Sequence, residues 1–116
     1  MSTARAVLDE HITESDFLTN IVALAHLSGW LVHHTRPART TKGWVTPIQG
    51  DPGLPDLILV KDRRLIFAEV KAQRGRMSDG QIRWVGMLDT VAEGTDLVDV
   101  FVWRPTDWPE IVEVLT

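Results

Sequence analysis

Polar and apolar residues in the first third of the chain follow a helical repeat and then change to a strand pattern. Thr13 or Ser15 can cap a helix that ends at Gly29, and its apolar stripe consists of Phe17, Ile21, Leu24 and Ala25. Residues 30–34 predict a strand, whereas residues 36–53, rich in Pro, Gly, Thr and basic side chains, predict a long loop. We expect residues 1–12 to form a loose arm ahead of a single domain over residues 13–116.

The middle of the chain predicts a β-hairpin. Two apolar runs, DLILV at residues 56–60 and LIFAEVK at residues 65–71, flank a short polar stretch. A turn at the centre of that stretch sets Asp56 opposite Glu69. Directly opposed residues share a face of the sheet, so the hairpin brings these two carboxylates side by side.

A second helix, a further strand and a tail complete the pattern. Ser78 is a typical helix cap, and the helix is predicted to run to about Glu93. Residues 97–103 (LVDVFVW) predict a strand that Pro105 breaks, and residues 106–115 fit a short helix or an edge strand. The order of elements indicates an α/β fold, with a small mixed β-sheet flanked by helices.

Charge is distributed unevenly along a chain whose net charge is −4. Residues 36–83 contain ten Lys/Arg against five Asp/Glu, a balance of +5, whereas the two ends together carry −9. A basic middle fits a DNA-facing surface. Cysteine is absent, which excludes disulfides and thiolate metal sites, and no apolar run is long enough for a bilayer. We therefore expect a cytoplasmic protein without a membrane partner.

The residues that carry chemistry are Asp56, Glu69 and Lys71. Strand side chains alternate, so Glu69 and Lys71 share a face, and the hairpin register adds Asp56 to it. Neighbouring carboxylates repel each other, and a divalent cation between them relieves the repulsion. Mg²⁺, with Mn²⁺ as a substitute, suits the oxygens of Asp56, Glu69 and the Val70 carbonyl. Such an ion would activate water for phosphodiester hydrolysis, assisted by Lys71. A solvated salt bridge at two strand ends is the non-catalytic alternative.

The sequence around these residues resembles the VRR-NUC branch of the PD-(D/E)xK nucleases over about residues 14–103. The family elements occur in order and at similar spacing as Gly53-Leu54-Pro55-Asp56, Glu69-Val70-Lys71, Gly75 and Ser78-Asp79-Gly80-Gln81. The resemblance implies a restriction-endonuclease-like core and metal-dependent cleavage of DNA. Stand-alone members of the family are small viral or bacterial proteins that act as homodimers on branched DNA. The resemblance therefore also implies a bacterial or phage-infected host cell and a homodimer that acts on branched DNA such as a Holliday junction.

The same resemblance assigns catalytic roles to Asp56, Glu69, Lys71, Gln81 and Glu14. Gln81 would point into the site from the second helix, at the top of a core-facing stripe formed by Trp84, Val85, Leu88 and Ala92. Ser78 and Gln81 also have the spacing of a helix capping box. Glu14 is explained equally well as an acid in the first turn of a helix, where the helix dipole favours it.

Basic residues on both sides of the motif are candidate DNA-phosphate ligands: Arg36, Arg39, Lys42, Arg74 and Arg76. Solvation alone explains the first three nearly as well, whereas the two that follow Lys71 are better supported. His33 and His34 are adjacent in a strand and face opposite sides, so they do not readily share one metal ion. We treat them as ordinary strand histidines and leave open whether one approaches the site.

The sequence thus predicts a magnesium-dependent DNA endonuclease that functions as a homodimer. The alternative is a catalytically silent protein of the nuclease fold, which binds DNA without cutting it or serves as a subunit of a larger repair or restriction complex. The intact set of Asp56, Glu69 and Lys71 favours the enzyme.

Overall fold

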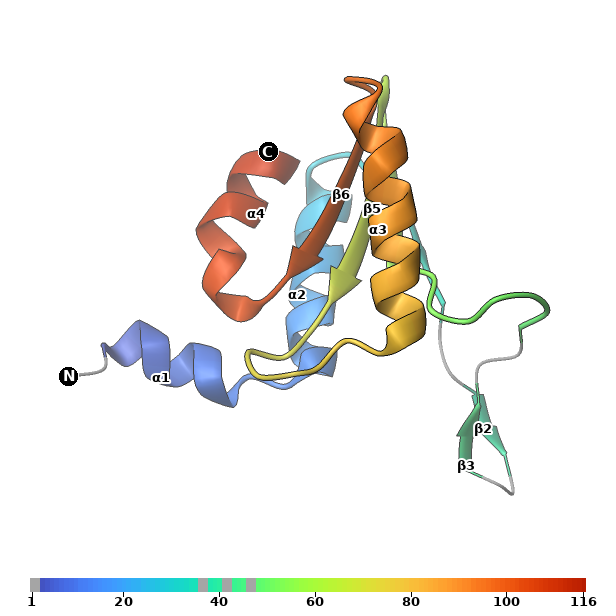
Figure 1. The fold of residues 1–116 in the computed structure, drawn as a ribbon. Helices are drawn as coiled ribbons and strands as arrows, with labels where there is room; N and C mark the ends of the chain where they lie inside the picture. The colour runs from blue at the N-terminus through green and yellow to red at the C-terminus, as the bar shows by residue number, and fades with distance from the viewer. Residues whose placement is uncertain (1–2, 36–37, 41–42, 46–47) are drawn as a thin grey trace.

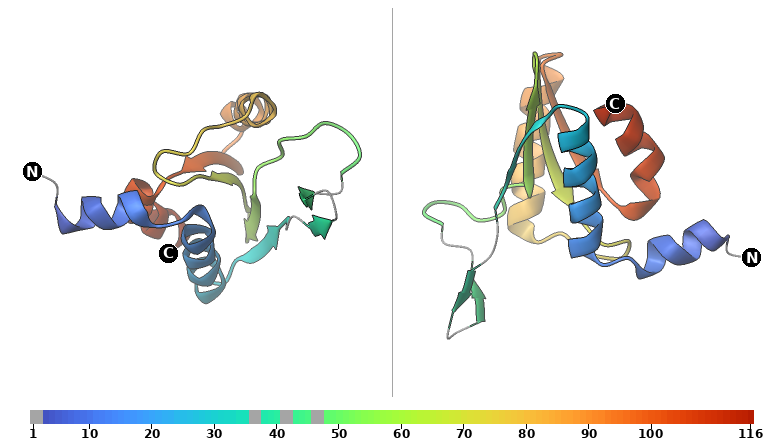
Figure 2. Two further views of the ribbon diagram at one scale, coloured as in Figure 1. Left: turned by 90° about the horizontal axis from the view of Figure 1, so that it is seen from below. Right: turned by 180° about the vertical axis from the view of Figure 1, so that it is seen from behind.

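The computed structural model describes residues 3–35, 38–40, 43–45 and 48–116. Its main body has three layers, with one helix on one face of a sheet and two on the other (Figures 1 and 2). The sheet contains, in spatial order, β1 (Leu31–His34), β4 (Leu57–Lys61), β5 (Arg64–Val70) and β6 (Val98–Trp103). The covering helices are α2 (Glu14–Leu27), α3 (Asp79–Glu93) and α4 (Trp108–Leu115). The predicted fold class, a small mixed sheet flanked by helices, is confirmed, and it is compatible with a restriction-endonuclease-like core.

The pairing of the strands confirms the predicted hairpin and its register. β4 and β5 are antiparallel, with Leu57 opposite Ala68 and Val60 opposite Leu65. Continued by one residue, this register sets Asp56 opposite Glu69. β5 and β6 are parallel, and the connection between them runs through α3.

The hydrophobic core lies between the sheet and the layer formed by α2 and α4. Buried side chains from these elements include Phe17, Ile21, Leu57, Leu59, Ile66, Ala68, Val70, Ile111 and Leu115. The tail, for which the sequence allowed a helix or a strand, forms α4 after a short 3-10 turn, η1 (Pro105–Asp107). Ile111 and Leu115 are one helical turn apart and both buried, which explains the helical outcome.

The opposite face of the sheet is covered less completely by α3. The predicted stripe of α3 faces the sheet, but Trp84 and its neighbours on the stripe are only half-buried, and α3 has no fully buried residue. The expectation that Trp84 belongs to the core is therefore wrong; its indole nitrogen donates to the Asp51 carbonyl, 3.2 Å away. Trp103 of β6, by contrast, is buried.

Two segments differ from the sequence prediction. The expected loose arm contains a helix, α1 (Ala4–His11), capped by Thr3 and supported by an Arg5–Asp9 ion pair of 3.2 Å. None of its residues is buried, and its eight residues are fewer than the span over which a helical repeat is recognised in a sequence. The expected long loop contains a two-stranded hairpin, β2 (Ala38–Thr40) and β3 (Gly43–Val45), which projects from the body (Figure 1). None of the helices in the described ranges has the length and hydropathy to cross a membrane.

Candidate active site

The candidate site lies where β5 ends and β4 begins. Glu69 is only 1% exposed and Lys71 8%, although both carry charged groups. Asp56 stands directly before β4, and its Oδ2 accepts a hydrogen bond of 2.8 Å from the backbone nitrogen of Val70. The backbone pairing of β4 and β5 ends at Leu57 and Ala68, and beyond it the Asp56 side chain accepts from Val70 in place of a backbone carbonyl. This bond fixes the Asp56 carboxylate beside Glu69.

Gln81 joins the site to the first turn of α3. Its Nε2 donates to Glu69 Oε1 at 3.1 Å, and its Oε1 accepts from the Ser78 backbone nitrogen at 2.9 Å. The Ser78 hydroxyl in turn accepts from the Gln81 backbone nitrogen, which completes a capping box. The two interpretations of Gln81 that the sequence allowed are therefore compatible, because one amide group contacts the carboxylate and caps the helix.

Two glycines allow the loop before Asp56 to touch the start of α3. Gly53 has a φ of +108°, and a Cβ atom there would stand 2.3 Å from the carbonyl carbon of Gly80. A Cβ atom on Gly80 would stand 2.6 Å from the Pro52 carbonyl oxygen. The two backbones are thus in direct contact, which only glycine permits at these positions. The contact holds the segment that carries Asp56 against the helix that carries Gln81.

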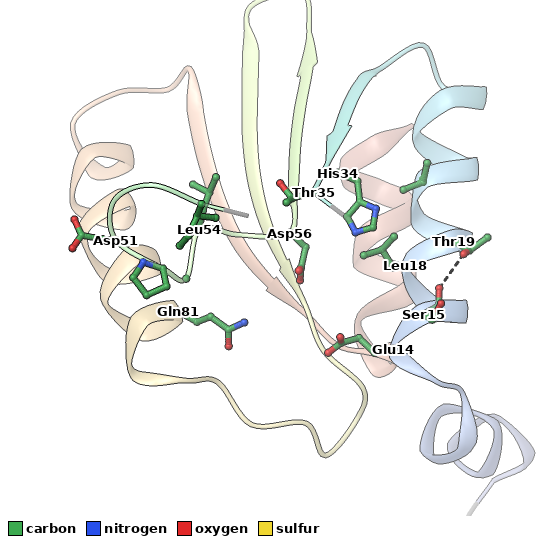
Figure 3. Close-up of a pocket in the computed structure, with 14 residues that line it drawn as sticks. Glu14, Ser15, Leu18, Thr19, His34, Thr35, Asp51, Leu54, Asp56 and Gln81 are labelled. Carbon is green, nitrogen blue, oxygen red and sulfur yellow. Dashed lines mark hydrogen bonds between the residues drawn. The ribbon is translucent and has the colours of Figure 1, made fainter. Parts of the chain in front are cut away.

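A cavity of about 830 Å³ opens in front of these residues, between α2 and the loop over residues 48–54. Glu14, Asp56 and Gln81 extend toward the same space from three different elements (Figure 3). Glu14 therefore faces the site as the resemblance implied, in addition to its place in the first turn of α2. His34 also lines this cavity, which the sequence left open. The apolar part of the wall comes from Leu18, Val22, Ile48 and Leu54.

The electrostatic environment of Glu69 is unfavourable to a negative charge. Burial is the largest cause that raises the pKa of its carboxyl group, to about 8, and the adjacent Asp56 and nearby Glu14 act in the same direction. The ammonium group of Lys71, whose Nζ lies 3.8 Å from Glu69 Oε1, lowers this pKa but does not outweigh the other causes. Glu69 Oε2 is buried and has no hydrogen-bond partner among the described residues. A buried carboxylate oxygen without a partner, next to a second carboxylate, is the feature that a bound cation would satisfy.

The donors available for such a cation are few. Within the described ranges, no three His, Asp or Glu side chains are grouped so as to hold one ion. The backbone carbonyl of Val70 is a further candidate donor. Successive residues of a strand direct their backbone groups to opposite sides, and the Lys71 nitrogen donates to Trp103 on β6. The backbone groups of Val70 therefore point away from β6 and toward Asp56, as the bond from Val70 N to Asp56 also indicates. Asp56, Glu69 and the Val70 carbonyl would be the oxygen donors to such a cation, with water and phosphate at the remaining positions.

The predicted DNA-binding residues differ in their environments. Arg74 is 84% exposed in its side chain and forms a 2.8 Å ion pair with Glu10 of α1, while Arg76 is exposed. The side chain of Arg39 and the whole of Arg36 and Lys42 lie outside the described residues.

Comparison with protein families gives one finding that bears on this site. The family model of the VRR-NUC domain matches residues 4–94, which include α2, the β4–β5 hairpin and α3, and thus all residues of the candidate site. A comparison with curated proteins finds no match. VRR-NUC domains are nucleases that generally cut DNA according to its structure, and the paired carboxylates and the buried lysine found here agree with that activity. The chain therefore belongs to the VRR-NUC domain family of nucleases.

Proposed function

We propose that this protein is a divalent-metal-dependent DNA endonuclease of the PD-(D/E)xK type, which cuts branched DNA such as a Holliday junction as a homodimer. The observation that carries the proposal is the buried Glu69 carboxyl group, which lies beside Asp56 and whose Oε2 has no hydrogen-bond partner in the part of the chain that the structure describes. Residues 13–116 would form the nuclease unit, with residues 1–12 attached through the Glu10–Arg74 pair.

Asp56, Glu69 and the Val70 carbonyl would hold the cation, Mg²⁺ or Mn²⁺. When bound, the cation supplies an acidified water and a positive charge opposite the phosphate. Asp56 is prepared for this role because the bond from Val70 N occupies Oδ2 and leaves Oδ1 for a ligand. Two carboxylates plus water and substrate phosphate make up the usual donor set of a catalytic Mg²⁺.

Lys71, Gln81 and Glu14 would act around this centre. The Lys71 ammonium lies 3.8 Å from Glu69 Oε1, where it can hold the attacking water or neutralise charge that develops on the phosphate. Gln81 fixes the Glu69 carboxylate through its Nε2 and leaves Oε2 free for the cation. Glu14, on the opposite wall of the cavity, can accept a hydrogen bond from a metal-bound or attacking water.

The DNA would enter through the cavity of about 830 Å³, which is far larger than a phosphate group requires. Its apolar wall suits the sugar and base of a nucleotide next to the cut bond. Arg74 and Arg76, three and five residues after Lys71, would contact neighbouring phosphates, and Arg74 would exchange its ion pair with Glu10 for the phosphate. We also assign Arg36, Arg39 and Lys42, on the segment around the β2–β3 hairpin, to DNA phosphates.

An apolar stripe on α3 supports the homodimer. Trp84, Met87, Leu88 and Val91 follow helical spacing along one side of α3, and Met87 and Val91 are 64% and 59% exposed. Trp84 and Leu88 of this stripe also border the sheet and are half-buried, whereas Met87 and Val91 lie on a flank of α3 that is exposed among the described residues. A two-fold pairing of such flanks would bury it and place two sites on one branched DNA.

A cleavage assay tests the proposal. The protein is incubated with labelled linear, flap and four-way DNAs in Mg²⁺, Mn²⁺ or EDTA, and binding is measured in parallel. We expect cuts in branched DNA with either metal and none in EDTA. Binding without cleavage under every condition would assign the chain to the alternative, a silent DNA-binding protein or a subunit of a larger complex.

A further inference from the structure

The loop that follows Lys71 is held by Arg104, which lies at the end of the neighbouring strand β6. Arg104 comes directly after β6, and its Nη1 donates to the carbonyls of Ala72, Gln73 and Gly75 at 2.9, 3.3 and 2.7 Å. No carboxylate of the described residues forms an ion pair with it. A single guanidinium nitrogen, whose two N–H groups are shared among three acceptors, therefore satisfies the carbonyls of one loop.

This loop covers the aliphatic part of Lys71. The Lys71 backbone nitrogen donates to the Trp103 carbonyl at 3.0 Å, and the loop begins at the next residue. Gly75 N donates back to Ala72 O at 3.0 Å, which turns the chain over the lysine. A Cβ atom built on Gly75 would lie 3.5 Å from Lys71 Cδ, in ordinary van der Waals contact. The side chain of Lys71 is consequently only 10% exposed.

Further hydrogen bonds fix Arg104 and connect its turn to the same loop. The Asp107 carboxylate accepts from the Arg104 backbone nitrogen at 2.8 Å. Gln73 Oε1 accepts from the Thr106 backbone nitrogen at 3.2 Å, and Gln73 Nε2 lies 3.4 Å from the Thr106 hydroxyl. The turn after β6 and the loop after β5 thus form one connected unit.

We propose that Arg104 is a positioning residue for the nuclease reaction, holding the loop over residues 72–75 against Lys71 so that the ammonium group stays beside Glu69. The inference rests on the proposed function of Lys71. Lysine has a long stem with several rotatable bonds, and without the loop its ammonium would turn into solvent. A displacement of about 1 Å at a reacting centre can lower a rate by about 100-fold.

A double-mutant cycle on cleavage tests this role. Arg104→Met removes the donors but keeps the stem, Arg104→Lys restores part of the donor set, and Arg63→Met at the exposed hairpin turn is the matched control. We expect Arg104→Met to lower kcat by at least about tenfold with little change in DNA Kd, and Arg104→Lys to recover most of the loss. In a Lys71→Ala background, Arg104→Met should lower the rate no further, because its effect passes through Lys71. Equal fractional losses in both backgrounds would show a merely structural role and overturn the proposal.

A second readout requires no cleavage and so separates this inference from the proposed function. Acylation of Lys71 by acetic anhydride, followed by mass spectrometry, should be faster in Arg104→Met than in the wild type or Arg63→Met. An unchanged rate would refute the role of Arg104 even if the protein cuts DNA. If Arg104→Met does not fold, Gln73→Ala replaces it, because this variant removes only the bonds to Thr106. Gln73→Ala should lower kcat and speed the acylation of Lys71, both by a smaller amount than Arg104→Met. No change in either quantity would count against the proposal.

Discussion

Replacing Glu69 with glutamine should stabilise the metal-free protein at neutral pH while removing its activity. In the native state burial, Asp56 and Glu14 raise the pKa of Glu69 from its usual 4.5 to about 8. The unfolded chain releases this proton near pH 4.5 and the folded protein retains it until about pH 8, so stability is full below pH 4.5 and falls as the pH rises between these values. Glutamine keeps the shape and the hydrogen-bond acceptor for Gln81 but has no proton to lose.

The size of the effect follows from the same pKa. One pKa unit corresponds to about 1.36 kcal/mol. Relative to its value below pH 4.5, the free energy of unfolding is therefore lower by up to about 3 kcal/mol at pH 7 and by up to about 5 kcal/mol above pH 8. These are upper limits, because water and small movements relax a buried charge. Chemical denaturation in EDTA at pH 5, 7 and 8.5 measures the difference for the wild type, Glu69→Gln and the exposed control Glu93→Gln.

We expect the wild type and Glu93→Gln to lose stability from pH 5 to pH 8.5, and Glu69→Gln to lose clearly less. Mg²⁺ should restore part of the loss in the wild type, because a cation that binds only the folded state stabilises it, and should not do so in Glu69→Gln. Identical pH dependence of the free energy of unfolding in all three proteins would refute the argument that Glu69 is held in an unfavourable environment.

The remaining predictions concern the lysine, the glycine contact and the dimer. Lys71→Ala should lower turnover by about 100-fold or more while DNA Kd changes little, because its work is done in the transition state; parallel losses of binding and rate would reassign it to simple DNA binding. Gly53→Ala should lower the free energy of unfolding in urea by about 2–4 kcal/mol, since its Cβ atom meets the backbone of α3. Gly86→Ala, whose Cβ atom meets nothing within 4 Å, should raise the free energy of unfolding by about 0.5–1 kcal/mol. Equal effects of the two substitutions would contradict the close approach of Gly53 to α3. Light scattering should show a dimer that Met87→Glu dissociates and that Leu27→Glu, exposed on α2, leaves intact; a wild-type monomer at micromolar concentration would refute the dimer.

The central part of the fold and site was predictable because its signals are local. The apolar alternation of β4 and β5 and the short polar turn fix the hairpin register, and that register alone sets Asp56 beside Glu69. Ser78 marks the start of α3 in the sequence, and the spacing to Gln81 indicates the capping box. The roles of these residues in catalysis stay predictions.

Other features depend on contacts that the sequence pattern does not contain. α1 has only eight residues and the β2–β3 strands have only three residues each, so all of them are too short for a repeat to be recognised in the sequence. Arg104 reaches carbonyls about 30 residues earlier in the chain, and carbonyl acceptors are present at every residue. The approach of His34 to the cavity depends on how β1 lies beside α2 and the loop before Asp56.

The most direct test of the account is the cleavage of a labelled four-way DNA junction by Asp56→Asn, the wild type and Asp89→Asn, an exposed control on α3. We expect the wild type and Asp89→Asn to cut the junction in Mg²⁺ and not in EDTA. Asp56→Asn should bind the same junction but cut it at least about 100-fold more slowly. Cleavage by Asp56→Asn at the wild-type rate, or undiminished cleavage by the wild type in EDTA, would contradict the claim that Asp56 and Glu69 hold a catalytic metal ion.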